Sequence, residues 1–233
     1  MPQVIQRSLV SDQVFGVVCE GILAGRYRPG EKLPTQRALA AELGVNMASV
    51  REAVKRLEQL GLVEVRHGDA MRVLDWRAHG GLDVIGHVLF RAGGLDAPTL
   101  ASLLEARRLM LAECARLAAE RRSPAQARRL VELGERMPQA ADAASAQALD
   151  FAFMTELVDA AGNVVFVLIL NSIRRLYFDH AELFEGVVAG LGELAPLYGR
   201  AAAAVEAGAP GRAGAALAKL ARLQERRSLE AAA

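Results

Sequence analysis

The feature that most constrains the fold is a pair of short helical segments that meet at a single glycine. Apolar residues recur three and four positions apart over residues 35–43 and again over residues 46–60. Gly44 between the two segments is typical of a helix C-terminus, and Thr35 suits the N-cap of the first helix. The pattern therefore predicts two short helices joined by a tight turn.

Alternating segments follow this pair of helices. Residues 62–66 and 71–74 alternate apolar and polar side chains as strands do, and residues 67–70 between them predict a hairpin turn. A further helix is expected before the pair, over residues 11–24. This order is that of a winged helix-turn-helix, whose second helix enters the major groove of DNA with its N-terminal residues at base edges. Two helices of a larger bundle would have the same spacing, so spacing alone leaves both interpretations open.

The pattern changes near Trp76, after which long helical periods dominate. A serine followed by a proline, Ser123-Pro124, is typical of a helix start. Other helices are expected over residues 96–121, 143–161, 164–177, 193–206 and 211–229. The chain is thus predicted to be mostly α, with a winged helix-turn-helix domain over residues 1–76 and an all-helical, antiparallel domain over residues 77–233.

Charge and composition exclude several classes of protein. The 28 Lys and Arg against 27 Asp and Glu give a net charge of +1, so contact with nucleic acid depends on a few placed residues. No run approaches the roughly 18 apolar residues that span a bilayer. With no signal-peptide pattern either, we expect a cytoplasmic protein without a membrane partner. No enzyme is expected, because the sequence offers no nucleophile–base pair, no GKS or GKT phosphate loop and no dinucleotide fingerprint.

Several motifs occur in order between residues 14 and 73: Tyr27-Arg28-Pro29-Gly30, Leu33-Pro34-Thr35-Gln36-Arg37, Leu43-Gly44-Val45, Val50-Arg51-Glu52-Ala53 and Gly61-Leu62-Val63. This segment resembles the N-terminal domain of the GntR superfamily of bacterial transcription regulators. The resemblance implies that an arginine after the Leu-Pro turn clamps phosphate or base, that the second helix reads bases, and that the hairpin enters the minor groove as a wing. By position, these roles fall on Arg37, Asn46, Ser49, Arg51, His67 and Gly68. Helix geometry adds Met47 to the DNA-binding residues, at the start of the second helix.

The sequence departs from the usual pattern of this superfamily at three places. Gln36 replaces a glutamate, and Asn46-Met47 replaces a hydroxyl residue followed by arginine. Asp69 adds a carboxylate to the wing. Loss of a cation and gain of an anion near phosphates predict an altered operator, in which Asn46 can still bind adenine through two hydrogen bonds.

The helical remainder resembles the effector domain of FadR-type regulators, in the order of the strings Glu105-Ala106-Arg107, Asp150-Phe151-Ala152-Phe153 and Ala161-Gly162-Asn163. The resemblance implies that residues 77–233 form an effector-binding and dimerisation domain. Many such domains hold a divalent metal through one Asp and three His. Asp150 matches the acidic ligand, but the histidine positions hold Met154, Tyr198 and, within one turn, Leu220. These residues suit neither zinc nor a hard cation, so we expect no metal and no other cofactor.

Within this subgroup, Leu168-Ile169-Leu170-Asn171 and Leu176-Tyr177 are most similar to the fatty-acid-metabolism regulators, which are metal-free and release DNA when a long-chain acyl-CoA enters the helical domain. The resemblance implies the same class of effector, or a similar amphiphile. Core packing is the alternative interpretation of Tyr177 and Phe184. The candidate ligand-binding residues are Leu104, Arg107, Asp150, Phe153, Tyr177 and Phe184.

Arg107 is the most informative of these residues, because a buried guanidinium needs an anionic partner. Asp150 or a ligand phosphate would supply that partner, and an exposed Arg107 would need neither. The sequence as a whole predicts a homodimer that binds double-stranded DNA at a near-palindromic operator. Two alternatives stay open: a ligand- or partner-binding protein with degenerate DNA recognition, and a regulator that senses a small carboxylate without metal.

Overall fold

The structure is a computed structural model that describes residues 7–66, 70–91 and 94–232 of the 233-residue chain. Contacts within the chain divide it into two compact units, Met1–Asp96 and Ala97–Ala233. His67, Gly68 and Asp69 at the expected hairpin tip lie outside the described residues.

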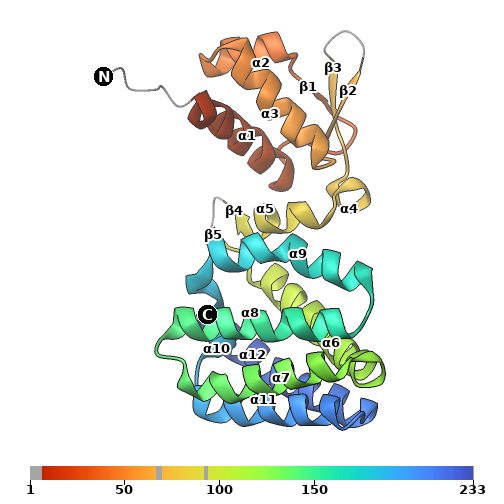
Figure 1. The fold of residues 1–233 in the computed structure, drawn as a ribbon. Coiled ribbons are helices and arrows are strands. Elements are labelled where there is room, and N and C mark those ends of the chain that lie inside the picture. The colour runs from red at the N-terminus through yellow and green to blue at the C-terminus, as the bar shows by residue number, and fades with distance from the viewer. Residues whose placement is uncertain (1–6, 67–69, 92–93, 233) are drawn as a thin grey trace, which may run out of the picture. The chain divides into compact units, whose positions relative to one another are not determined.

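The first unit combines short helices with a three-stranded sheet (Figure 1). The described elements are α1 (Arg7–Leu23), β1 (Lys32–Leu33), α2 (Gln36–Leu43), α3 (Met47–Gln59), β2 (Val63–Arg66), β3 (Ala70–Val73), α4 (Trp76–His79), η1 (Leu82–Val84), α5 (Ile85–Leu89), β4 (Phe90–Arg91) and β5 (Gly94–Leu95). Helices α2 and α3 and strands β2 and β3 confirm the predicted helix pair and hairpin.

Local capping signals set the ends of α2 and α3. Thr35 Oγ1 accepts a hydrogen bond from the backbone N–H of Ala38 at 3.2 Å and opens α2. Gly44 ends that helix at a φ of 65°, a left-handed conformation that glycine adopts without the Cβ clash of other residues. Asn46 Oδ1 then accepts from the backbone N–H of Ser49 at 2.9 Å and opens α3. The turn between the helices is therefore encoded by residues within it.

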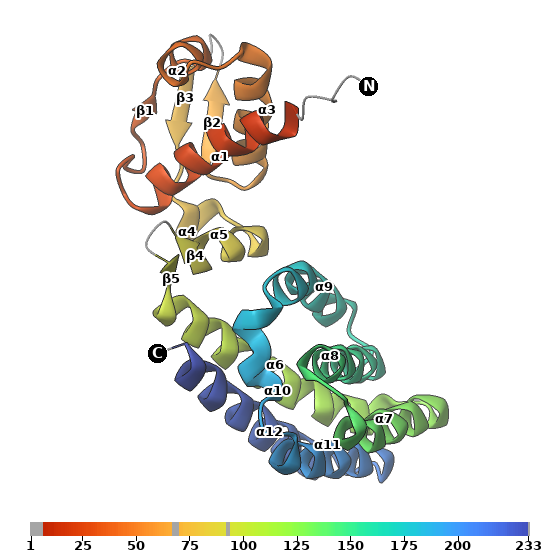
Figure 2. The same cartoon turned by 90° about the vertical axis from the view of Figure 1, so that its left-hand side faces the viewer.

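The core of the first unit lies between the helices and the sheet. Val50 and Leu57 on α3 are at most 1% exposed, and α1 packs along this helix (Figure 2). In the antiparallel sheet β3 lies between β1 and β2, so that Met71 pairs with Leu33 on one side and Val65 on the other. This packing fixes α3 and leaves its N-terminal end at the surface.

The first unit continues past Trp76. Val84 and Val88 are buried in the same core as α1 and α3. The compact unit therefore ends at Asp96, whereas the composition change suggested a boundary at residue 76. The antiparallel pair β4–β5 was not predicted, because a strand of two residues shows no alternation.

The second unit is a helical bundle. The described elements are α6 (Ala97–Arg121), α7 (Pro124–Arg136), η2 (Met137–Gln139), α8 (Ala143–Ala160), α9 (Val164–Asp179), η3 (Ala181–Phe184), α10 (Glu185–Val188), α11 (Leu191–Glu206) and α12 (Pro210–Ala231). Helix α7 packs against α8 and α11, and α12 packs along α6 and α11 (Figures 1 and 2). Ser123 and Gln126 form a capping box that opens α7 at Pro124, as predicted.

Helix α9 differs from the other long helices of the bundle. Only Leu170 and Tyr177 of its 16 residues are buried. Val164, Val165 and Leu168 are 68%, 56% and 59% exposed, although exposed positions of a folded helix are usually polar. Helix α9 therefore presents an apolar face to solvent in the single chain.

Candidate functional site

The first candidate site is the surface around the start of α3. Arg37 on α2 and Arg51 on α3 are both exposed, and neither forms a hydrogen bond or ion pair with another described residue. A free guanidinium presents a planar fork of N–H donors that matches phosphate or the edge of guanine. These two arginines therefore have the access and the chemistry that DNA binding requires.

The other residues expected to contact DNA have structural roles. The side-chain oxygen of Asn46 caps α3, so its amide nitrogen is the part left for a base. Met47 is half-buried and packs against the core, and Ser49 is only 4% exposed. Contact of Met47 and Ser49 with DNA stays a prediction. Burial does not favour it, because both residues lie on the inner side of the first turn. His67 and Gly68 lie outside the described residues.

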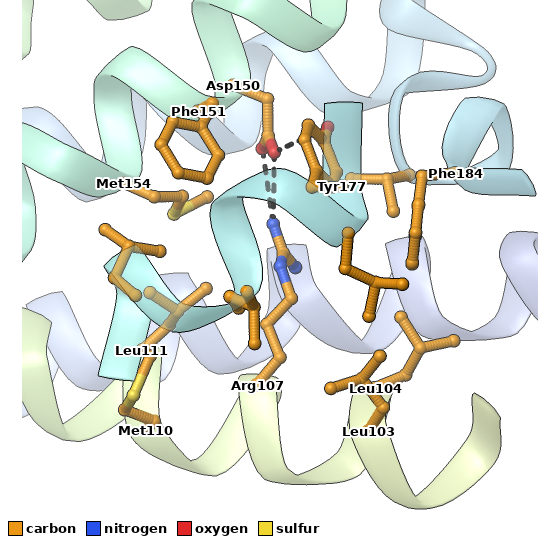
Figure 3. Close-up of a pocket in the computed structure, with 14 residues that line it drawn as sticks. Leu103, Leu104, Arg107, Met110, Leu111, Asp150, Phe151, Met154, Tyr177 and Phe184 are labelled. Atoms are coloured by element: carbon orange, nitrogen blue, oxygen red, sulfur yellow. Dashed lines mark hydrogen bonds and ion pairs between the residues drawn. The ribbon is translucent and has the colours of Figure 1, made fainter. Parts of the chain in front are cut away.

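The second candidate site is centred on the carboxylate of Asp150 on α8, which is 1% exposed. Arg107 on α6 donates from Nη2 to Oδ2 at 3.2 Å (Figure 3). Tyr177 on α9 donates its hydroxyl to the same oxygen at 3.2 Å. Oδ1 accepts from the hydroxyl of Tyr198 on α11 and, at 3.1 Å, from Gln224 Nε2 on α12. One carboxylate thus binds side chains from four other helices.

All the side chains that contact the Asp150 carboxylate act as hydrogen-bond donors. Burial, with a smaller contribution from the charge of Asp150, raises the pKa of Tyr177 and of Tyr198 well above the usual value, and both hydroxyls stay protonated. Gln224 accepts from Arg107 Nη1 at 2.8 Å through its carbonyl oxygen and donates to the Tyr198 hydroxyl at 2.8 Å. The network is consistent in every donor and acceptor, as burial at this depth requires.

A pocket adjoins this network (Figure 3). Its walls come from α6, α8, α9 and the η3–α10 segment, and they are apolar except for Arg107, Asp150 and the hydroxyl of Tyr177. Phe151 and Phe184 stack beside Tyr177, with ring centroids 5.6 and 5.3 Å from its ring. The free volume is only about 40 Å³, enough for a few water molecules. The lining side chains fill most of the space themselves.

The structure brings together most of the predicted ligand-binding residues. Those that line the pocket are Leu104, Arg107, Asp150, Tyr177 and Phe184. Phe153 is not among the lining residues: it is fully buried and contacts the Tyr198 ring at a centroid distance of 5.1 Å. Phe151 and Met154 on the same helix line the pocket instead, which the sequence did not single out.

Arg107 lies inside the protein, and Asp150 is the anionic partner that a buried guanidinium requires. Sequence reasoning missed Gln224. Leu220, one turn earlier on α12, had been placed in this region, but it is fully buried and does not line the pocket. The sequence signal that could have identified Gln224 is its place on the apolar side of α12. Leu217, Leu220 and Ala221 lie at helical spacing from it.

The residues around Asp150 do not fit a divalent metal. The Arg107 guanidinium occupies the cationic position beside the carboxylate, and Tyr198 presents a protonated hydroxyl. Met154 offers a thioether, which hard cations do not select. Within the described residues, no group of three or more His, Cys, Asp or Glu could hold a metal ion. None of the described helices is long and apolar enough to cross a membrane.

Comparison with known proteins gives matches over both units. Residues 10–73 match the family of bacterial regulatory proteins named gntR, and residues 102–223 match the FCD domain. The chain is 41% identical over 175 residues to the HTH-type transcriptional regulator Mce2R of Mycobacterium tuberculosis, covering 75% of this chain and 73% of that protein. It is 30% identical to the regulator LutR of Bacillus subtilis over 192 residues, covering 72% and 86%.

A fatty acid metabolism regulator protein of Yersinia pestis is 30% identical over 160 residues, or 69% of this chain and 66% of the relative. Among solved structures, Streptococcus agalactiae GntR has a TM-score of 0.50 at 23% identity, covering 93% of this chain and 99% of that chain. Lar of Listeria monocytogenes has a TM-score of 0.53 at 18% identity, covering 97% and 98%. The chain belongs to the GntR family of bacterial regulatory proteins, and it is a transcription regulator with an FCD effector domain rather than an enzyme.

Proposed function

We propose that this regulator binds a near-palindromic operator as a homodimer and that a long-chain acyl-CoA, bound in the helical unit, changes its affinity for DNA. The observation that carries the proposal is the apolar pocket beside the buried Arg107–Asp150 pair. Such a pocket suits an alkyl chain, and the fatty acid metabolism regulators among the relatives support this class of effector. A ligand that binds two conformations of the helical unit unequally shifts the population between them, and DNA affinity follows.

On the DNA side, the proposal rests on Arg37 and Arg51, both exposed and without a protein partner among the described residues. A homodimer would present two copies of α3 to two half-sites related by the same twofold axis. The exposed apolar face of α9, formed by Val164, Val165 and Leu168, supports self-association, because solvent-exposed apolar surface of this kind marks contact sites. The protein would act in the cytoplasm, where the chromosome lies.

The DNA-binding part is tested by fluorescence anisotropy with a duplex from the regulator's own upstream region. We expect tight binding by the parent that weakens steeply with salt, and binding that is lost in Arg37→Ala and in Arg51→Ala with unchanged helical content. Arg116→Ala is the matched control, because that exposed arginine lies in the helical unit and pairs with Glu113 and Glu120. Wild-type affinity in both DNA-face variants would overturn our assignment of the binding surface.

Weak binding with a flat dependence on salt would instead favour the hypothesis of degenerate DNA recognition. The effector is tested by adding palmitoyl-CoA or oleoyl-CoA to the complex and, separately, by following the melting temperature of the free protein. We expect weaker DNA binding and a higher melting temperature, because a ligand that binds only the folded state stabilises it. No change in either measurement, with operator binding intact, would remove acyl-CoA and leave a small carboxylate as the second candidate.

A further inference from the structure

The charge balance of the pocket restricts what it can bind. Arg107 and Asp150 are the charged residues in the lining, and they neutralise one another at 3.2 Å with side-chain exposures of 13% and 2%. Nearby Arg108 does not line the pocket and is paired with Glu225. The described lining therefore holds no second cation for a ligand anion.

The hydrogen-bonding capacity of Arg107 is not exhausted, however. A guanidinium carries five N–H donors. Among the described residues, Nη1 donates to Gln224 and Nη2 to Asp150, whereas Nε has no partner. Arg107 is part of the pocket wall and is otherwise surrounded by apolar side chains. At least one N–H donor of this pocket-lining residue is thus not used by the described residues.

A ligand carboxylate and an uncharged ligand carbonyl would differ in the free energy with which they bind this donor. A carboxylate would place a second negative charge close to Asp150 with one guanidinium to serve both, and a buried charge without its own partner is strongly unfavourable. An uncharged carbonyl loses less hydration on entry and gains a hydrogen bond to a charged donor. The pocket therefore favours a neutral acceptor over an anion.

We infer that the buried polar group of the effector is an uncharged carbonyl, as in an ester, thioester or amide, and that the pocket excludes free carboxylates. This inference rests on the proposed function, since it takes this pocket as the effector site, and it separates the two effector classes left open there. Asp150 is the residue that determines this specificity, because it occupies the position at Arg107 that a ligand carboxylate would otherwise take.

The test compares decanamide with decanoate at pH 7.5 by isothermal titration calorimetry. The two compounds have the same chain and differ in charge. We expect the parent protein to bind decanamide about tenfold tighter or more. In Asp150→Asn the guanidinium loses its carboxylate, so decanoate affinity rises about tenfold or more and the preference for decanamide is lost. The matched control is Glu113→Gln, which removes an exposed carboxylate paired with Arg116 in the same unit and leaves the preference unchanged.

Equal or tighter binding of decanoate by the parent would overturn the inference, as would binding of neither compound or an unchanged preference in Asp150→Asn. The asparagine keeps the shape of the side chain and one acceptor oxygen, and circular dichroism verifies that the variant folds. If it does not fold, the comparison in the parent protein decides alone. The proposed function and this inference are contradicted by different results. An operator affinity that palmitoyl-CoA does not change contradicts the proposed function. A changed operator affinity together with tighter binding of decanoate than of decanamide contradicts only this inference.

Discussion

The two units use arginine in opposite ways. Arg51 in the first unit is exposed and unpaired within the described chain, whereas Arg107 in the second is buried and bound to Asp150 and Gln224. In the first unit the anionic partner would come from outside, on the DNA, and the fold does not depend on it. In the second unit the anion belongs to the protein, so the same contacts hold the helices together and line the pocket. On the proposed function, recognition and stability are separable at Arg51 and coupled at Arg107.

The coupling in the second unit follows from where the five network residues lie. Asp150 receives hydrogen bonds from side chains on α6, α9, α11 and α12. Loss of one donor leaves the carboxylate buried with fewer partners, and the cost of such a group is far greater than the net worth of the lost hydrogen bond. Loss of an exposed arginine leaves only water in its place.

The largest expected effect is that of Arg107→Ala. It removes the cation from a buried pair, so we expect the free energy of unfolding to fall by about 3–5 kcal/mol. Urea unfolding followed by circular dichroism measures this change. Arg116→Ala is the control: its pairs with Glu113 and Glu120 are exposed, so it should cost at most about 1 kcal/mol. Equal costs for the two variants would break the contrast between the buried and exposed arginines.

An intermediate effect is expected at Asn46, where the first unit does combine structure with recognition. Asn46→Ala removes the cap of α3 and should lower the stability of the first unit by about 0.5–2 kcal/mol, with weaker operator binding. Asn46→Asp keeps a capping oxygen, so it should keep the stability and lose affinity through repulsion by phosphate. Thermal unfolding and anisotropy on both variants separate the two roles. A loss of stability in the aspartate variant as large as in the alanine variant would contradict the capping role.

The smallest expected effect concerns His87 of the first unit. Burial, and secondarily the charge of Arg56, lowers the pKa of His87 in the folded state. The unfolded chain therefore takes up the proton first as the pH falls through about 6.5, and stability falls until the folded-state pKa is passed. Unfolding at several pH values between 5 and 8 should show this loss in the parent, and less of it in His87→Gln. Identical pH profiles would contradict the shift.

The sequence predicted the elements whose ends are encoded locally. Thr35, Gly44 and Asn46 mark the helix pair, and Ser123-Pro124 marks α7, because capping involves residues within a few positions of one another. The contacts of Asp150 could not be predicted in the same way. Gln224 is 74 positions away, and whether it or Leu220 faces the carboxylate depends on how α12 is rotated against α6 and α11 in the packed bundle. A rotation of this kind is set by packing over the whole interface, which leaves no local sequence signal.

The small free volume of the pocket has a consequence for the concentration at which the regulator responds. With about 40 Å³ of free space, the acyl chain of the proposed effector would enter only after lining side chains have moved. If the open conformation makes up one part in a hundred of the population, the apparent affinity is about a hundredfold weaker than that of the open form. On the proposed function, the response threshold would depend on the free energy of that movement. Substitutions outside the lining that change this free energy would then raise or lower the threshold without any change in the residues that contact the effector.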